Sequence, residues 1–257
     1  FNHIDTAEVY HTHEEVGKAL EKYHHMREKL WITDKYFPKS WEWRKCKGPL
    51  ESVNLSLKTM NLKYYDLYML HSSDITKETA GIDLKEAWRQ MEEMLELGLT
   101  RNIGVSNFTV TALEEIKSFC RVMPTVNQIE FSPYLQEQSP GIFEYCAKND
   151  IIIEAYSPLA PLSRARPGPL DDILPGLTAK YNRSETQILL RWAIQRGVVV
   201  LTTSSKQERL KEILGIFDFE LEESDVNLVS EIGSKKHYQW CLKEFFDEYR
   251  LKVADRA

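Results

Sequence analysis

The sequence predicts an α/β fold with a parallel sheet covered by helices, and it favours a closed eight-stranded (β/α)8 TIM barrel over an open doubly wound sheet. Two observations predict the class. Short β-rich runs alternate with longer amphipathic stretches, and no Gly/Ser-rich or Pro-rich linker divides the chain. A third bears on the architecture: the eleven glycines never occur as G-x-G, so the dinucleotide and phosphate-loop motifs of open sheets are absent from the sequence.

Seven runs have the composition of strands: residues 1–4, 30–33, 66–70, 102–105, 126–129, 151–156 and 198–201. Polar residues follow them, namely Asp5, Asp34, Lys35, His71, Ser106, Asn107, Gln128, Ser157 and residues 202–205. In a barrel, all of these side chains meet at the rim formed by the carboxyl ends of the strands. That rim is where we expect the functional site.

Helices are predicted between the strands. Leu84, Ala87, Trp88, Met91 and Leu95 form one apolar stripe at three- and four-residue spacing. Capping boxes, in which side chains satisfy unpaired N–H groups at a helix start, are predicted at Thr111, Ser184 and Ser205, each followed three residues later by Glu or Gln. We expect these helices to cover the outside of the sheet.

The composition excludes several classes of function. Asp and Glu outnumber Lys and Arg by 39 to 33, and this net charge of -6 argues against a nucleic-acid partner. No apolar run approaches the roughly 20 residues that cross a bilayer. The four cysteines include no C-x-x-C pair, so we expect neither a structural zinc nor a disulfide framework. We expect a cytoplasmic location. His11, His13, His24 and His25 are expected to be exposed loop residues rather than metal ligands.

Four polar residues at the predicted rim have a joint chemistry. The hydroxyl of Tyr10, with an ordinary pKa of about 10, can protonate a developing alkoxide if the ammonium of Lys35 lowers that pKa. Asp5 would hold Lys35 charged and in place, while His71 would donate to or orient the substrate oxygen. Together they form a general-acid site for reduction of a carbonyl group.

Six segments of the chain resemble the aldo-keto reductase family, in the family's order: residues 2–7 with Tyr10, 14–20, 66–71, 103–108, 127–128 and 155–159. The resemblance implies a barrel that binds NADPH without a Rossmann motif. Asp5, Tyr10, Lys35 and His71 match the catalytic tetrad, with Tyr10 as proton donor. The residues that match the nicotinamide-amide contacts are Ser106, Asn107 and Gln128. Tyr156 matches the ring that stacks on the nicotinamide, and Ser157 and Leu159 match the pyrophosphate loop.

The sequence departs from the family pattern at three places. Thr203 stands where most NADPH-dependent members have lysine, although Ser204 and Arg209 remain to bind the 2'-phosphate, in a stretch similar to fungal conjugated polyketone and α-keto amide reductases. Ser72-Ser73 replaces a bulky tryptophan, and Trp41 and Trp43 are candidates for a replacement wall of the pocket. The family's first strand and helix precede the segment that begins at Phe1, so residues 1–257 are predicted to be a single barrel domain lacking both.

We therefore predict an enzyme that transfers hydride from NADPH to a ketone or aldehyde, with an α-keto or dicarbonyl compound as the suggested substrate and a monomer as the default state. One alternative is a catalytically impaired or inactive member that binds nucleotide and serves as an interaction protein. The second is a barrel hydrolase that uses Asp5 or Glu154 as acid or base, which would require a suitably spaced carboxylate pair.

Overall fold

The structure is a computed structural model that describes residues 1–38 and 46–254, so Trp41 and Trp43 lie outside the described residues. It divides into two compact units, Phe1–Asn127 and Gln128–Ala257. Each unit is described below by itself. The expectation of one barrel domain over residues 1–257 stays a prediction.

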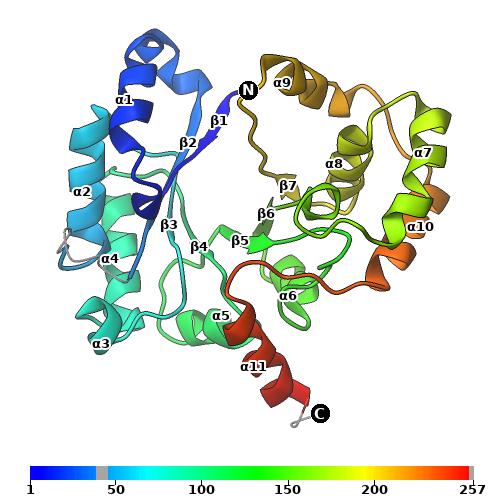
Figure 1. Cartoon of the computed structure of the whole chain (residues 1–257). Coiled ribbons are helices and arrows are strands. Elements are labelled where there is room, and N and C mark those ends of the chain that lie inside the picture. Colours follow the sequence, from blue (N-terminus) through cyan, green and yellow to red (C-terminus); the bar gives the residue numbers. More distant parts are fainter. Residues whose placement is uncertain (39–45, 255–257) are drawn as a thin grey trace. The chain divides into compact units, whose positions relative to one another are not determined.

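The first unit is a parallel sheet with helices along one side (Figure 1). Its strands β1 (His3–Asp5), β2 (Trp31–Tyr36), β3 (Leu67–Leu70) and β4 (Ile103–Ser106) pair with their neighbours in that order. Its α-helices are α1 (His13–Glu21), α2 (Pro49–Met60), α3 (Lys77–Ala80), α4 (Leu84–Glu96) and α5 (Val110–Lys117). The register sets Asp5 opposite Thr33, and Lys35 opposite Met69. Residues at the carboxyl ends of β1 and β2 are therefore close in space.

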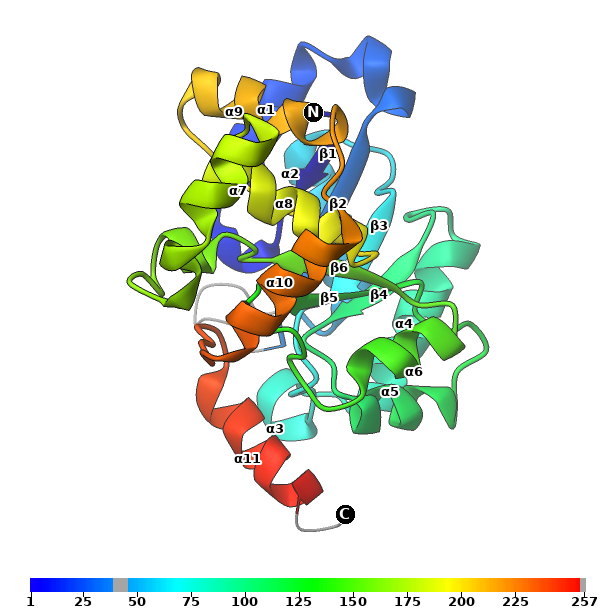
Figure 2. The same ribbon diagram turned by 90° about the vertical axis from the view of Figure 1, so that its right-hand side faces the viewer.

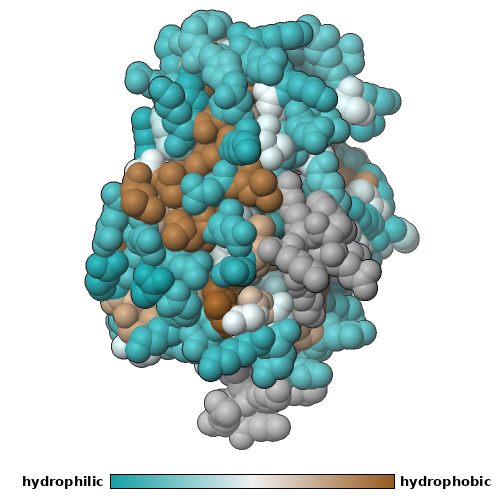
Figure 3. Space-filling view, turned by 90° about the vertical axis from the view of Figure 1, so that its left-hand side faces the viewer, coloured by the Kyte–Doolittle hydropathy of each residue, from teal (hydrophilic) through white to brown (hydrophobic). Residues whose placement is uncertain are grey.

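Helix α4 shows how the sequence pattern becomes packing. Leu84, Ala87, Trp88 and Met91 are buried as predicted, and the stripe continues through Met94 rather than through the half-buried Leu95. Hydrophobic burial of this kind contributes about 1.5–3 kcal/mol for each large side chain. Figure 3 turns the side that carries the helices of this unit toward the viewer, where hydrophilic side chains cover most of the surface and hydrophobic ones gather near its middle.

The second unit contains two paired strands, β6 (Ile152–Tyr156) and β7 (Val199–Val200), which run parallel. Strand β5 (Val126–Glu130) spans the point of division. The α-helices of the second unit are α6 (Ile142–Lys148), α7 (Leu174–Tyr181), α8 (Glu185–Gln195), α9 (Gln207–Leu214), α10 (Glu223–Ser234) and α11 (Lys243–Ala254). Helices α7, α8 and α10 lie side by side (Figure 2), and Trp192 of α8 donates to Ser230 of α10 at 3.0 Å.

All seven predicted strands are confirmed in the described part of the chain, and their ends differ from the predicted ones by at most three residues. The capping box at Ser184 is also confirmed, whereas two other predicted helix starts are wrong. Helix α5 is capped by Thr109, two residues before the predicted cap at Thr111, and the hydroxyl of Thr109 accepts from the Ala112 N–H. At α9 the Ser204 hydroxyl accepts from Lys206 N–H, and the N-cap position is Lys206. A search of the described residues finds no helix long and apolar enough to span a bilayer.

Candidate active site

Lys35 and Asp5 form the centre of the site in the first unit. The ammonium Nζ of Lys35 donates to Asp5 Oδ2 at 2.6 Å and to the main-chain carbonyl of Thr6 at 2.9 Å. The Lys35 side chain is fully buried, while that of Asp5 is 19% exposed. Burial lowers the pKa of Lys35, but the Asp5 carboxylate and Tyr10 outweigh burial and raise that pKa above its ordinary value. Lys35 is therefore a buried, permanently charged ammonium at neutral pH.

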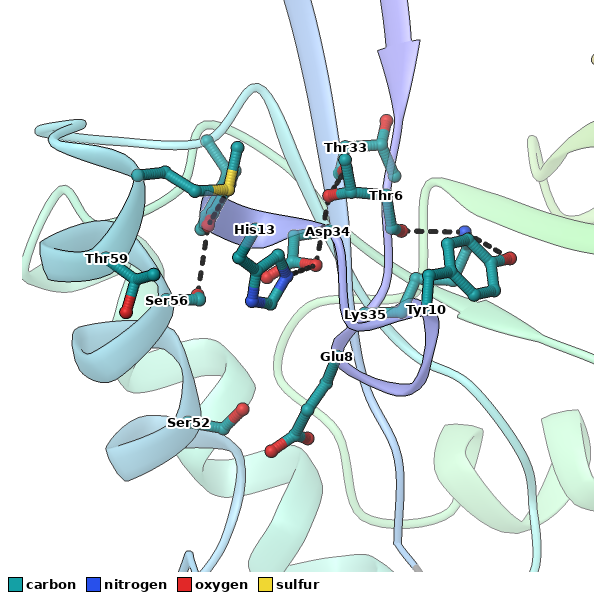
Figure 4. Close-up of polar contacts among 12 residues, drawn as sticks. Thr6, Glu8, Tyr10, His13, Thr33, Asp34, Lys35, Ser52, Ser56 and Thr59 are labelled. Carbon is teal, nitrogen blue, oxygen red and sulfur yellow. Dashed lines mark hydrogen bonds and ion pairs between the residues drawn. The ribbon is translucent and has the colours of Figure 1, made fainter. Parts of the chain in front are cut away.

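Tyr10 reaches this ammonium from the loop that follows β1. It ends the 3-10 helix η1 (Glu8–Tyr10), and its hydroxyl accepts from Lys35 Nζ at 3.3 Å (Figure 4). Because the ammonium is the donor, the hydrogen of the Tyr10 hydroxyl is left to be donated elsewhere. Tyr10 is 44% exposed, so its hydroxyl, which lies beside a positive charge, is also accessible to a ligand.

His71 completes the predicted tetrad directly after β3, where its N–H donates to the carbonyl of Tyr36 at 2.9 Å. Its ring meets the ring of Tyr10 edge-on, with centroids 5.8 Å apart, and Phe37 packs against it at 5.7 Å. Burial, followed by the nearby Lys35 charge, lowers the pKa of His71 to about 3. The imidazole is neutral at pH 7, so it can donate one N–H but is not an imidazolium acid.

Ser106 and Asn107 follow β4 in the same unit, and both are buried. Asn107 has a left-handed backbone with φ of 63°, a conformation that asparagine tolerates better than most residues. Its amide Nδ2 donates to the carbonyl of His71 at 3.1 Å and to Ser106 Oγ at 3.0 Å. These contacts tie the end of β4 to the end of β3. The structure thus brings Asp5, Tyr10, Lys35 and His71 together, with Asn107 bonded to the last of them.

The remaining predicted cofactor residues lie in the second unit. The amide of Gln128 donates to the carboxylate of Glu154 at 2.9 Å. Tyr156 ends β6, and its hydroxyl accepts from Gln138 at 3.3 Å. Burial is the main cause that raises the pKa of Tyr156 well above its ordinary value, so this hydroxyl is a weaker acid than free tyrosine. Ser157 has a left-handed φ of 56°, which turns the chain sharply after β6.

Leu159, two residues further on, packs against an apolar cluster of Leu190, Ile213 and Ile216. This contact fixes the predicted pyrophosphate loop on α8 and α9. The predicted phosphate residues lie around the start of α9: Thr203 and Arg209 are exposed and Ser204 is half-buried. Helix N-termini favour anions, and an exposed guanidinium can form charge-assisted hydrogen bonds with phosphate oxygens.

Comparison with known proteins decides the family. The model of the aldo/keto reductase family matches residues 1–234. The chain belongs to the aldo-keto reductase family. Membership makes it an NAD(P)H-dependent oxidoreductase that reduces carbonyl groups.

Among its relatives, this aldo-keto reductase is 44% identical over 235 residues to the NADPH-dependent alpha-keto amide reductase of Saccharomyces cerevisiae, covering 90% of this chain and 74% of the relative. It is 40% identical to the NAD/NADP-dependent indole-3-acetaldehyde reductase of Schizosaccharomyces pombe, covering 95% of this chain and 83% of the relative. The solved Bombyx mori aldo-keto reductase in complex with NADP matches with a TM-score of 0.83 at 32% identity, over 97% of this chain and 84% of that one. This match confirms the predicted barrel class.

Sequence reasoning misplaced two residues beside the predicted tetrad, His13 and Asp34. Asp34 was expected at the rim, but its side chain is fully buried and lies against His13. His13 was expected in an exposed loop, but it is the first residue of α1 and only 3% exposed. Its Nε2 lies 2.9 Å from Oδ1 of the fully buried Asp34. The usable signal was the apolar strand around Asp34, because a charged residue inside such a run requires a buried partner.

Proposed function

We propose that the chain reduces a ketone or aldehyde with hydride from NADPH, and that Tyr10 protonates the oxygen of the product alcohol. The observation that carries the proposal is the Lys35 ammonium, which stands 3.3 Å from the Tyr10 hydroxyl and 2.6 Å from the Asp5 carboxylate. A cation at this distance stabilises the tyrosinate that remains after the proton leaves. The tyrosine is therefore a stronger acid than it would be alone.

Each tetrad residue has a distinct role in this proposal. Asp5 keeps Lys35 charged and fixed through the 2.6 Å ion pair. His71, neutral because its pKa is lowered to about 3, can donate an N–H to the substrate oxygen without giving up a proton. Tyr10 is then the acid of the group, since its hydrogen is not used in the bond to Lys35. This division supports Tyr10 rather than His71 as the proton donor.

The chemistry of the polar residues fits NADPH. When bound, NADPH supplies the hydride. Ser106, Asn107 and Gln128 offer amide and hydroxyl groups of the kind that bind a carboxamide, and Tyr156 offers an aromatic face. Ser204 and Arg209 offer a hydroxyl and a guanidinium for the 2'-phosphate. The names of the relatives support this cofactor, because one is NADPH-dependent and another uses NAD or NADP.

For the substrate, we propose a compound whose reacting carbonyl is adjacent to a second carbonyl, as in an α-keto amide or a dicarbonyl. The yeast relative, 44% identical, is named for reduction of an alpha-keto amide. An electron-poor carbonyl of this type develops alkoxide charge readily, and it suits a site whose acid is supported by a buried cation. Ser72, directly after His71, is half-buried, and it is smaller and more polar than the tryptophan that many family members have at this place.

The experiment is NADPH oxidation with α-keto amides, diketones and simple aldehydes, compared between the wild type, Tyr10→Phe and Tyr23→Phe. Tyr23 is 52% exposed in the same unit and serves as the matched control. We expect Tyr10→Phe to bind NADPH with unchanged affinity and to lose about 10²-fold or more in kcat, the size of a general-acid contribution. Tyr23→Phe should keep wild-type turnover. Full activity of Tyr10→Phe would show that another group is the proton donor.

The same assay separates the alternative of a non-catalytic nucleotide-binding member. That alternative requires saturable NADPH binding with no turnover of any carbonyl in the panel. A hydrolase has less support. The carboxylate of Asp5 accepts from Lys35, and that of Glu154 accepts from Gln128, so both are engaged by nitrogen donors.

A further inference from the structure

A buried carboxylate lies directly behind the proposed tetrad. Asp34 precedes Lys35 on β2, and because side chains alternate along a strand, the two point to opposite faces of the sheet. The Asp34 side chain is 0% exposed. A fully buried carboxylate is strongly unfavourable unless it is paired and hydrogen-bonded. Its partners therefore indicate why the position holds an acid.

One oxygen of Asp34 has two hydrogen-bond partners. Its Oδ1 lies 2.9 Å from His13 Nε2 and 3.1 Å from Thr6 Oγ1. The single hydrogen of the Thr6 hydroxyl is shared with the main-chain carbonyl of Thr33 at 2.7 Å, and Figure 4 shows these contacts. Burial raises the pKa of Asp34, but hydrogen bonding and charge from His13 outweigh burial, and the pKa lies below its ordinary value. The carboxylate is therefore ionised at neutral pH, and His13 Nε2 must carry the hydrogen in this contact.

These two partners bracket the loop that carries the proposed proton donor. We call residues 7–12 the Tyr10 loop: Thr6 immediately precedes it, and His13 immediately follows it as the first residue of α1. Within the loop, the N–H of Tyr10 donates to the carbonyl of Ala7 at 2.9 Å, and His11 turns the chain with a left-handed φ of 58°. The two residues that flank the Tyr10 loop, Thr6 and His13, thus both contact Oδ1 of Asp34.

Thr6 also links this contact to the lysine. Its main-chain carbonyl accepts from Lys35 Nζ at 2.9 Å, and its N–H donates to the carbonyl of Thr33 at 2.9 Å. Asp34 and Lys35, consecutive on β2, therefore hold Thr6 from the two faces of the strand. A shift of Thr6 would change the position of the Lys35 ammonium relative to the Tyr10 hydroxyl.

We propose that Asp34 is a positioning residue. Through its contacts with His13 and Thr6 it fixes both ends of the Tyr10 loop, and it thereby sets the 3.3 Å distance between Lys35 Nζ and the Tyr10 hydroxyl. Asp34 acts through these partners and does not itself touch the substrate. The inference rests on the proposed role of Tyr10 as proton donor. It adds a requirement that the tetrad alone does not contain, namely a buried carboxylate that is hydrogen-bonded to His13 on the helix-facing side of β2.

The decisive test is the double variant His13→Leu/Asp34→Val. Replacement of a buried charged group together with its partner by apolar residues is often neutral for folding, so we expect a melting temperature close to that of the wild type. The affinity for NADPH should stay within about twofold, while kcat should fall about tenfold or more, because small misplacements of a reacting group cost up to about 10²-fold. A purely structural role of the pair predicts the opposite: restored packing would restore kcat.

The pH profile of kcat provides a second readout. Asp5, Lys35 and His71 face Tyr10 and are unchanged in the double variant. If the Tyr10 loop moves away from Lys35, the ammonium lowers the pKa of Tyr10 less, and the basic limb of the profile moves to higher pH. A folded double variant with wild-type kcat and an unmoved basic limb would overturn the proposal.

Thr6→Val supplies a milder test in case the double variant does not fold. It removes the hydroxyl that donates to Asp34 and to the Thr33 carbonyl, but keeps the Thr6 carbonyl that accepts from Lys35. The matched control is Tyr68→Phe, which removes the buried 3.0 Å hydrogen bond to Ser52 in the same unit. We expect kcat to fall about threefold to tenfold in Thr6→Val and to stay unchanged in Tyr68→Phe. Equal kcat values for the two variants would contradict the proposed positioning role of Asp34. A wild type that binds NADPH but reduces no carbonyl would contradict the proposed function instead.

Discussion

Replacement of Lys35 by methionine tests the electrostatic core of the proposed mechanism. Methionine keeps the length of the side chain and removes the charge 3.3 Å from the Tyr10 hydroxyl. Two unit charges at that separation interact by about 5 kcal/mol at an effective dielectric of about 20. Because Tyr10 is 44% exposed, solvent screening reduces this energy, and we take about half, roughly 2–2.5 kcal/mol. The loss corresponds to about a thirty- to seventyfold fall in kcat.

The assay is steady-state NADPH oxidation across a pH series, with NADPH affinity measured separately. Without the ammonium, the pKa of Tyr10 rises, so the basic limb of the kcat profile should move to higher pH by about 1.5–2 units. The Asp5 carboxylate is left without Lys35, which also lowers stability. The variant Asp5→Asn/Lys35→Met also removes the charge of the Asp5 carboxylate, so it should recover stability without recovering kcat. A folded Lys35→Met with kcat within threefold of wild type and an unmoved basic limb would refute the reasoning.

Three further predictions follow from the described contacts. The pKa of His71 falls from 6.5 to about 3 on folding, so the unfolded chain binds more protons than the folded chain between these pH values. The free energy of unfolding should therefore fall by about 2 kcal/mol from pH 7 to pH 5. Urea unfolding of His71→Asn should show a smaller fall over the same pH range. Asn107→Ala should lower the free energy of unfolding by about 1–3 kcal/mol, because it removes two hydrogen bonds and strains the left-handed backbone, while Asn107→Gly should relieve the strain. Arg209→Ala should raise the KM for NADPH about tenfold and leave that for NADH unchanged, because only NADPH carries the 2'-phosphate.

The strands were predictable from the sequence because each is a short apolar run that ends at polar residues. Helix starts were less predictable where several residues compete to cap the same turn. Thr109 caps α5 although Thr111 and Glu114 have the better-known spacing. Near α9, the N-cap residue is Lys206 rather than Ser205, and the hydroxyl of Ser204 accepts from the Lys206 N–H. The competing hydroxyls lie one or two residues apart, and only the path of the loop decides which one reaches the N–H.

The convergence of Asp5, Tyr10, Lys35 and His71 was predictable because each lies near the carboxyl end of a predicted strand or in the loop after it. The packing behind them was not. His13 lies in a polar stretch beside His11, and both were assigned to an exposed loop, yet His13 is 3% exposed. Its burial depends on Asp34, 21 residues later, facing α1 from β2. No local pattern encodes a pairing between a helix start and a strand interior.

Strand β2 carries two successive buried charged residues, one on each face, and each is hydrogen-bonded to a group of a different element. Lys35 is paired with Asp5 of β1, and Asp34 is paired with His13 of α1. Loss of either partner would leave a charge in a protein interior, where it is poorly solvated. The end of β1 and the start of α1 are therefore both tied to β2, and the chain between them has little freedom to move. Because Tyr10 lies on that short connection, the position of its hydroxyl depends on the buried polar contacts on both faces of one strand.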